Sequence, residues 1–173
     1  MAGSLIKIAE TTVSSAVASV TLTGIDSTYD VYMLAMNNVA PSTDSVYLTM
    51  RVTESGTPNT TSNYDSAYKN LRADTSFSNS NYQNISFFYL NNNHIGTNTS
   101  EQLNGIKYIF NANNSSEYTF FTNEVSTLSN TSNLWGNQGG EVFTSASSVD
   151  GVHLFMDTGN IASGKFTLYG LKK

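Results

Sequence analysis

The stretch of residues 150–173 constrains the fold more than any other part of the chain. Two apolar runs, residues 152–156 and 166–171, flank a polar segment that contains Gly159 and Gly164. Two short β-type runs separated by a glycine-containing segment are typical of a β-hairpin. The sequence therefore predicts a terminal hairpin, and the other strands must be arranged around it.

The second of these runs is apolar on both of its faces. Because successive side chains of a strand point to opposite faces, Phe166 and Leu168 share one face, while Tyr169 and Leu171 share the other. A strand of this kind needs cover on both sides, and an isolated hairpin is only marginally stable in water. We therefore expect these side chains to be buried in the core or in an interface with another chain.

Similar runs recur along the rest of the chain, separated by Gly, Asn and Ser turns. Several of them, such as residues 31–36, 85–90 and 118–125, are also apolar on both faces, which is more apolar surface than one sandwich of this length readily covers. Oligomerisation would bury the surplus. Together with the terminal hairpin, the predicted strands number about nine or ten and cover residues 5–9, 17–23, 25–39, 46–53, 85–90, 103–110, 118–125 and 142–144.

One segment has helical spacing. In residues 64–73, Tyr64, Ala67, Tyr68 and Leu71 recur at intervals of three and four residues, which is the period of an amphipathic helix. Asn63, directly before them, is a residue type that caps helix N-termini well. The sequence therefore predicts one short helix here.

Three polar segments are predicted to be connections without regular structure. Residues 74–84 link the predicted helix to the next strand, and residues 91–102 contain His94. Residues 126–141 contain the single tryptophan, Trp135, near a pair of glycines. We expect the loops that carry His94 and Trp135 to be exposed and to contact an external partner.

The pattern of elements indicates the fold class. Many short strands without an alternation of strands and helices favour an all-β, antiparallel sandwich, and a jelly roll is the version that we expect. At 173 residues the chain fits one domain, 1–173. In that architecture the first and last strands lie near each other, so we expect residues 5–9 to be close to residues 165–171.

The composition excludes several classes of protein. Only 12% of the residues are charged and the net charge is −5, which argues against binding to the phosphate backbone of nucleic acids. No apolar run is long enough to span a membrane as a helix, and the first residues lack the pattern of a secretory signal. The absence of cysteine excludes disulfides and thiolate metal sites. We expect synthesis in a cytosol.

The residues that commonly carry catalysis are few. His94 lies in a polar segment and His153 in an apolar strand, where an inert exposed imidazole and a hydrogen-bonded core or interface residue are the simpler interpretations. Asp26 and Asp30 bracket a turn, and capping of that turn is a simpler role than cation binding. Trp135 is either a platform for a saccharide or a packing residue at a subunit contact. We therefore expect no catalytic, cofactor-binding or metal-binding residues and no enzymatic activity.

Both ends of the chain carry a resemblance to a known group of proteins. The opening SLIKIAETTVSSAVASVTLTGIDSTYDVYML, with its I-x-S-T-Y-D-x-Y pattern at residues 25–32, and the ending GNIASGKFTLYGLKK, with S-G-K-F-T-L-Y-G at residues 163–170, resemble small β-rich virion proteins of tailed bacteriophages, especially those of marine and cyanobacterial hosts. A weaker S-x-Y-D-like pattern occurs at residues 63–65, and residues 75–140 carry little of the resemblance.

This resemblance implies a place in a virus particle rather than an activity. It suggests a decoration or cement protein on the outside of the capsid, bound to the major capsid protein and associated as a homotrimer. The alternative is a tail-fibre or receptor-binding domain that contacts a host surface glycan. We expect decoration because the chain has no long stalk or collagen-like repeat and a strand follows soon after its first methionine.

Overall fold

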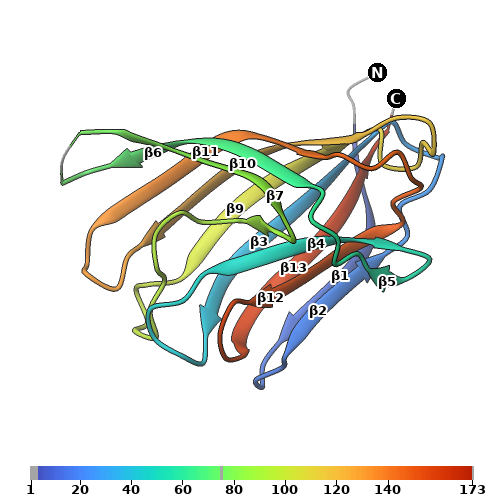
Figure 1. The fold of residues 1–173 in the computed structure, drawn as a ribbon. Coiled ribbons are helices and arrows are strands. Elements are labelled where there is room, and N and C mark those ends of the chain that lie inside the picture. Colours follow the sequence, from blue (N-terminus) through green and yellow to red (C-terminus); the bar gives the residue numbers. More distant parts are fainter. Residues whose placement is uncertain (1–3, 75, 173) are drawn as a thin grey trace.

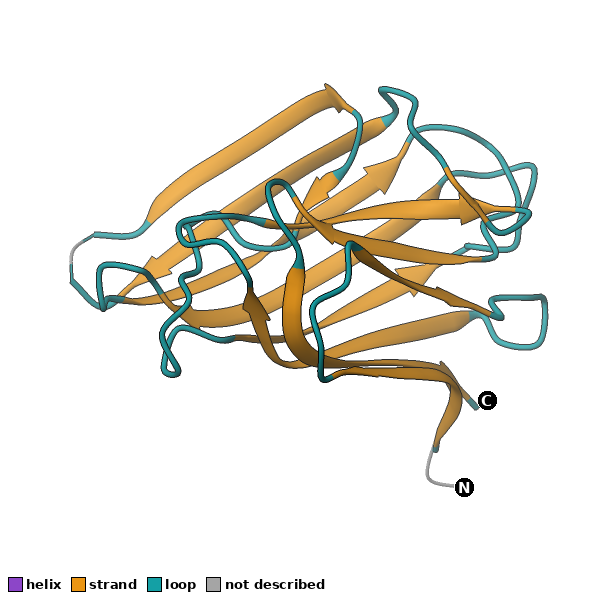
Figure 2. Cartoon of the chain, turned by 90° about the horizontal axis from the view of Figure 1, so that it is seen from below, coloured by secondary structure: helices purple, strands orange, loops and turns teal. Residues whose placement is uncertain are grey.

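A computed structural model describes residues 4–74 and 76–172, so that residues 1–3, 75 and 173 of the predicted domain lie outside the described part. The described residues form thirteen strands. Figure 2 shows strands joined by loops, without a helix among the described residues. The predicted all-β class is confirmed. The strands are β1 (Leu5–Val13), β2 (Ser19–Thr23), β3 (Val31–Pro41), β4 (Leu48–Glu54), β5 (Thr57–Pro58), β6 (Tyr64–Arg72), β7 (Ser78–Ile85), β8 (Phe88–Tyr89), β9 (Leu103–Phe110), β10 (Thr119–Leu128), β11 (Leu134–Phe143), β12 (Gly151–Met156) and β13 (Ile161–Leu171).

The strands form two antiparallel sheets that pack face to face (Figure 1). The larger sheet has eight strands in the order β1-β13-β3-β9-β10-β11-β6-β7, and the smaller has the order β2-β12-β4-β5, with β8 paired to β4. At both ends of the chain, successive strands alternate between the sheets, which is the connectivity of a jelly roll.

The two terminal strands belong to different sheets, so the predicted terminal hairpin is wrong. β12 pairs with β2 and β4 in the smaller sheet, whereas β13 lies between β1 and β3 in the larger one. The exposed, glycine-containing segment between them reverses the chain and connects the smaller sheet to the larger one. A turn signal in the sequence marks such a reversal, but it does not distinguish a hairpin within one sheet from a connection between two sheets.

The first and last strands are direct neighbours, as expected. β1 pairs with β13 along its whole length, from Leu5 opposite Leu171 to Val13 opposite Gly164. The end of β13 and the start of β1 therefore lie side by side (Figure 1).

The predicted helix is a strand. Residues 64–72 form β6, in which Tyr64, Ser66, Tyr68 and Asn70 are buried while the alternate residues are more exposed. Tyr64 and Tyr68 are four residues apart, a spacing that fits both a helix and one face of a strand. The inward-facing residues between and after them are polar, and this hides the period of two in the sequence.

Two further strands were predicted to be polar connections. β7 lies within the predicted link at residues 74–84, and β11 occupies much of the predicted loop at residues 126–141. β11 is central in the larger sheet, between β10 and β6. The apolar run at residues 85–90 is shorter as a strand than predicted, since only β8 pairs there with β4.

One hydrophobic cluster lies between the sheets and joins them. Leu34 and Met36 from β3, Leu48 and Met50 from β4, and Phe166 from β13 are fully enclosed. This cluster fixes which face of the larger sheet points outward. Helices that could span a membrane are not found among the described residues.

Candidate functional site

The first notable surface feature is the free edge of β1. This strand ends the order of the larger sheet, so one side of its backbone pairs with β13 and the other pairs with no strand among residues 4–74 and 76–172. Leu5 and Ile6 are 50% and 38% exposed. They point to opposite faces, since Leu5 lies opposite Leu171 and Ile6 opposite Gly170. We call Leu5, Ile6 and the adjoining Leu171 the β1 edge.

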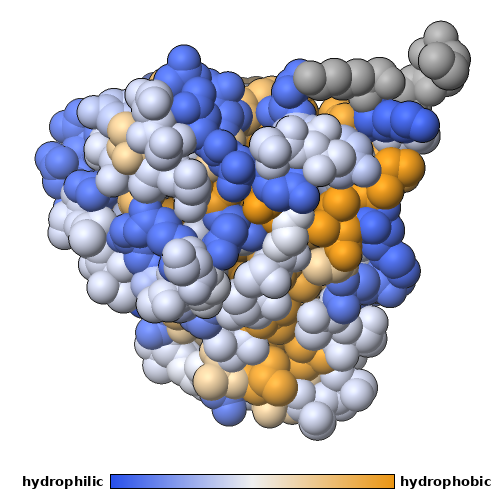
Figure 3. Space-filling model, turned by 90° about the vertical axis from the view of Figure 1, so that its right-hand side faces the viewer, coloured by the Kyte–Doolittle hydropathy of each residue, from blue (hydrophilic) through white to orange (hydrophobic). Residues whose placement is uncertain are grey.

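Hydrophobic surface extends along this side of the molecule. Figure 3 looks onto the side that is at the right of Figure 1, where β1 and β2 lie, and shows a hydrophobic band running down it. Exposed strand edges with large apolar residues tend to pair with other chains. The β1 edge is therefore suited to contact with a protein.

The second feature lies at the other end of the larger sheet, on its outer face, which is the face turned away from the smaller sheet. Strand register aligns residues there in rows across the strands. The first row is mostly apolar and consists of Val31, Phe110, Phe120, Val142 and Asp65. The second consists of Met33, Tyr108, Thr122, Gly140, Ala67 and Asn81.

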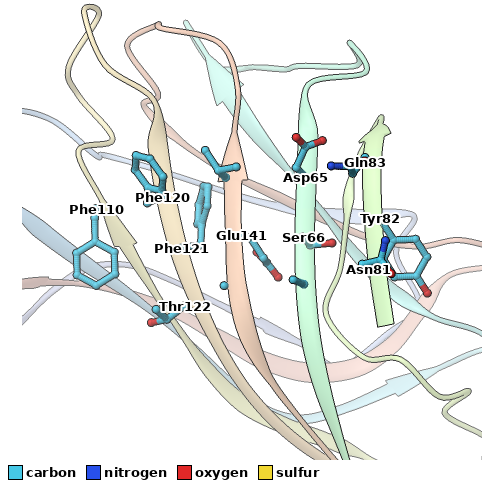
Figure 4. Close-up of a pocket in the computed structure, with 13 residues that line it drawn as sticks. Asp65, Ser66, Asn81, Tyr82, Gln83, Phe110, Phe120, Phe121, Thr122 and Glu141 are labelled. Carbon is cyan, nitrogen blue, oxygen red and sulfur yellow. The ribbon is translucent and has the colours of Figure 1, made fainter. Parts of the chain in front are cut away.

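A hollow of about 510 Å³ opens where these rows cross β11. Figure 4 shows its two unlike sides: Phe110 and Phe120 come from β9 and β10, whereas Asp65, Asn81 and Gln83 come from β6 and β7. Thr122, Ala67, Gly140 and Val142 lie between them.

The hollow continues along β11. A second hollow of about 460 Å³ shares Thr122 with the first, and a third of about 320 Å³ shares Ile106, Glu124 and Gln138 with the second. The outward positions of β11 include Gly136 and Gly140, whose lack of side chains keeps the surface low. We call the three hollows together the β11 groove.

The polar side of the groove presents unused hydrogen-bonding capacity. Asn81 and Gln83 are exposed, and no other described residue hydrogen-bonds their amide groups. Asp65 is partly buried, and its Oδ1 accepts a hydrogen bond from the backbone N–H of Asn84 at 2.7 Å. This bond holds the carboxylate in place, while its second oxygen remains available to a ligand.

The side chains predicted to form an interface divide between two environments. Phe166 and Leu168 are fully buried in the core between the sheets. Tyr169 and Leu171 lie on the outer face and are partly exposed. Among these residues, the outward pair alone is accessible to a partner.

His94 and Trp135 differ in their surroundings. His94 lies in the connection between β8 and β9, is partly buried, and its ring centroid is 4.4 Å from that of Tyr47. Trp135 is not in a loop, because it belongs to β11, where it is partly buried, and the guanidinium carbon of Arg72 lies 4.2 Å from its ring centroid. The prediction of an exposed loop is therefore wrong for Trp135.

The other candidates have structural partners. His153 Nδ1 lies 2.8 Å from Thr21 Oγ1, and burial, aided by the nearby charge of Arg51, lowers the pKa of its imidazole. Asp26 Oδ1 accepts a hydrogen bond from the N–H of Thr28 at 2.8 Å, as in a turn cap, and hydrogen bonds from Thr28 lower the pKa of its carboxyl group. The described residues contain no group of three or more His, Cys, Asp or Glu that could hold a metal ion.

The chain was compared with protein families, curated proteins and solved structures. No family model, curated protein or solved structure matches it. The β1 edge, the β11 groove and the chemistry of their residues are therefore the features that indicate a function.

Sequence patterns alone did not reveal the groove. Its aromatic side chains come from strands that were predicted, but its floor is in a segment predicted to be a loop. The one available signal was the pair Gly139 and Gly140, which reads equally as a turn. Strand register is needed to bring Asp65, Asn81 and Phe120 to one surface.

Proposed function

We propose that this chain is a non-enzymatic structural protein of a tailed-bacteriophage virion, made in the host cytoplasm and attached to the outside of the capsid as a decoration or cement protein. The observation that carries the proposal is the β1 edge. Leu5 and Ile6 are more than a third exposed on a strand whose outer backbone groups pair with no other described strand. Such an edge favours association unless another chain covers it.

A homotrimer is the assembly that we propose, with the β1 edge of each copy covered by a neighbouring copy. The trimer would contact the major capsid protein. The three-fold number comes from analogy with phage decoration and fibre proteins, whereas the involvement of Leu5, Ile6 and Leu171 comes from their position at the β1 edge. No cofactor is part of the proposal.

The placement of the histidines supports a non-enzymatic role. His94 packs on Tyr47, and His153 is next to Thr21. A general base in hydrolysis needs a nucleophile or water positioned beside it, commonly with a carboxylate to orient it. Neither histidine hydrogen-bonds a carboxylate within the described part of the chain. Replacing either one by Ala should leave assembly intact.

The test combines mass and location. Light scattering of the purified protein should give three times the chain mass of 18.8 kDa, and Leu5→Lys with Ile6→Lys should give the monomer mass. Thr12→Lys is the control, because Thr12 is exposed in the same strand and the substitution adds a positive charge, one instead of two, outside the apolar edge. A monomer mass for the unaltered protein at micromolar concentration would contradict the homotrimer.

Antibody labelling of purified particles in the electron microscope tests the location. Label over the capsid shell is the expected result. Label confined to the tail would favour the second candidate function, and absence of the protein from particles would contradict both.

The second candidate is a tail-fibre or receptor-binding domain that contacts a host surface glycan. The β11 groove is the observation that favours it, since it joins exposed aromatic rings to unpaired amide groups. The groove lies toward β6 and β7, at the end of the larger sheet opposite the β1 edge. A copy attached through β1 would leave it open to solvent.

A further inference from the structure

We propose that the β11 groove binds a neutral, linear oligosaccharide, with Phe110 and Phe120 packed against one sugar ring and Asp65, Asn81 and Gln83 hydrogen-bonded to hydroxyl groups of other rings in the same chain. This inference deepens the second candidate function, and it holds whether the protein is attached to the capsid or to the tail.

The size and form of the groove suit such a ligand. The first hollow, of about 510 Å³, falls within the range of small-molecule sites, roughly 300–1,000 Å³. The second and third hollows extend it along one strand direction. An extended open groove admits the middle of a chain as well as its end, so it suits a linear polymer.

Glycine occupies the two adjacent positions 139 and 140 of β11 for different reasons. Gly139 faces the core side, where an added Cβ would come within 2.2 Å of the Ala67 carbonyl oxygen, so packing requires glycine there. At Gly140 an added Cβ would meet nothing within 4 Å, and its φ is not positive. Glycine within a strand lowers stability by roughly 0.5–1 kcal/mol relative to Ala. Since neither packing nor backbone geometry requires Gly140, an open surface for a ligand accounts for it.

The aromatic side supplies an apolar platform. Phe120 is 48% exposed, and Phe110 beside it is partly exposed. Their register is direct, with Phe120 opposite Phe110. One face of a pyranose ring is lined by C–H groups, so it packs against an aromatic ring as another apolar surface does.

The polar side matches hydroxyl groups. A hydroxyl both donates and accepts hydrogen bonds, and the amides of Asn81 and Gln83 do the same, whereas the carboxylate of Asp65 only accepts. The side chains of Asn81 and Gln83 are exposed, and the hydroxyl of Thr122 is exposed between the two sides. Asn81 and Gln83 lie across β11 and β6 from the aromatic rings (Figure 4). Since neighbouring strands are about 4.8 Å apart, an oligosaccharide of several sugar rings is needed to contact both sides at once.

The charges of the groove select a neutral chain. Among the described residues, Asp65 is the only charged one whose side chain faces the first hollow, because the carboxylate of Glu141 is buried on the core side with Lys107. In the second hollow, Lys69 and Glu124 offset each other. Without an excess of Lys or Arg, the groove offers nothing to offset the charge of sulfated, uronic-acid or nucleic-acid chains.

Binding is tested on the purified full chain. Cellohexaose, laminarihexaose, mannohexaose and xylohexaose are the neutral probes, and hexagalacturonate and a heparin hexasaccharide are the anionic ones. Each is titrated by calorimetry and by ¹⁵N–¹H NMR. At least one neutral probe should bind, with amide shifts concentrated in β6, β7, β10 and β11, and the anionic probes should not.

Two variants and one control locate the site. Phe120→Ala should weaken binding about tenfold or more, the effect of losing one aromatic contact. Phe77→Ala is the matched control, since Phe77 is 58% exposed but lines none of the hollows of the groove, and it should leave binding unchanged. Gly140→Val should also weaken binding while the melting temperature stays close to that of the unaltered protein.

Three results would overturn the inference: no binding of any neutral probe, tighter binding of the anionic probes, or neutral binding that Phe120→Ala and Gly140→Val do not change. The outcome of the oligosaccharide titrations does not depend on where the antibody label is found on the particle. A protein absent from particles that still binds a neutral hexasaccharide would contradict the virion function alone.

Discussion

Lys107 on β9 and Glu141 on β11 form an ion pair across the intervening β10, and neither side chain is exposed to solvent. The pair is enclosed on the core side of the larger sheet. Tyr68 donates a hydrogen bond from its hydroxyl to Glu141 Oε1 at 2.6 Å, and the Lys107 ammonium lies 4.9 Å from the ring centroid of Phe88 and 5.4 Å from that of Phe121. Burial lowers the pKa of Lys107 even though Glu141 opposes the shift.

The first prediction concerns the loss of one partner of this pair. Lys107→Met leaves the Glu141 carboxylate buried without its counter-ion, and the expected loss in free energy of unfolding is about 3–5 kcal/mol. Urea denaturation followed by fluorescence measures it. In the double variant Lys107→Met with Glu141→Met, no charge remains buried, so most of the loss should be recovered.

The control for this prediction is an exposed pair of the same type. Arg72 Nη2 lies 2.7 Å from Asp74 Oδ2 near the end of β6, with both side chains partly exposed. Asp74→Asn should change the free energy of unfolding only slightly, because solvent already screens the pair. If Lys107→Met lowers the free energy of unfolding no more than Asp74→Asn does, the prediction for the buried pair is wrong.

The second prediction tests the position of β13 inside the larger sheet. Leu168 is fully buried, so Leu168→Ala should lower the free energy of unfolding by about 2–5 kcal/mol. Leu171→Ala changes the partly exposed end of the same strand, so it should lower the free energy of unfolding much less. Denaturant midpoints compare the two variants. Equal losses in free energy of unfolding would contradict this position of β13 in the larger sheet.

Removal of residues 166–173 is the more severe form of the same test. β13 separates β1 from β3, so the truncated chain loses the pairing partner of both strands and should be insoluble. Soluble truncated protein with an unchanged circular dichroism spectrum would contradict this.

The parts of the fold that the sequence predicted well are those where apolar residues face the core. β4 and β12 alternate or are apolar throughout, and their positions agree with the prediction to within a few residues. The proximity of the first and last strands was also predicted, from the architecture rather than from any contact between particular residues.

The missed strands have polar residues on the core side. In β11 the inward residues include Asn137 and Glu141. Asn137 Oδ1 accepts a hydrogen bond from Asn123 Nδ2 at 2.9 Å, and Glu141 Oε1 accepts one from the Tyr68 hydroxyl at 2.6 Å. In β7, Ser80 Oγ accepts from Asn70 at 2.8 Å. These partners are distant in the sequence or on neighbouring strands, and hydrophobic periodicity carries no information about them. In β6 the inward-facing Ser66 and Asn70 are also polar. They hide the period of two, and the sequence therefore predicted a helix there.

The third prediction concerns Trp135, which was expected to make only an external contact. In β11 it lies opposite Arg72 of β6, and its ring packs against the Arg72 guanidinium. A cation–π contact at a partly exposed site is worth about 0.5–1 kcal/mol. Trp135→Ala should therefore lower the melting temperature slightly and leave the oligomer mass unchanged in light scattering. Loss of assembly would show that Trp135 lies in the subunit interface.

The fourth prediction is a pH dependence of stability that comes from His153. In β12 this residue lies between Thr21 on β2 and Arg51 on β4. Burial first, and then the positive charge of Arg51, lower the pKa of the folded imidazole from its ordinary value of about 6.5. As the pH falls below about 6.5, the unfolded chain takes up a proton at His153 before the folded chain does, so protonation favours unfolding.

The stabilisation due to neutral His153 is thus present above the unfolded pKa and is lost as the pH falls through the folded pKa. His153→Gln cannot be protonated, while its amide can still hydrogen-bond Thr21. Urea denaturation from about pH 8 to about pH 5 should show the unaltered protein losing stability relative to His153→Gln. A constant difference between the unaltered protein and His153→Gln over the whole range would contradict the assignment, because carboxyl groups titrate equally in both proteins.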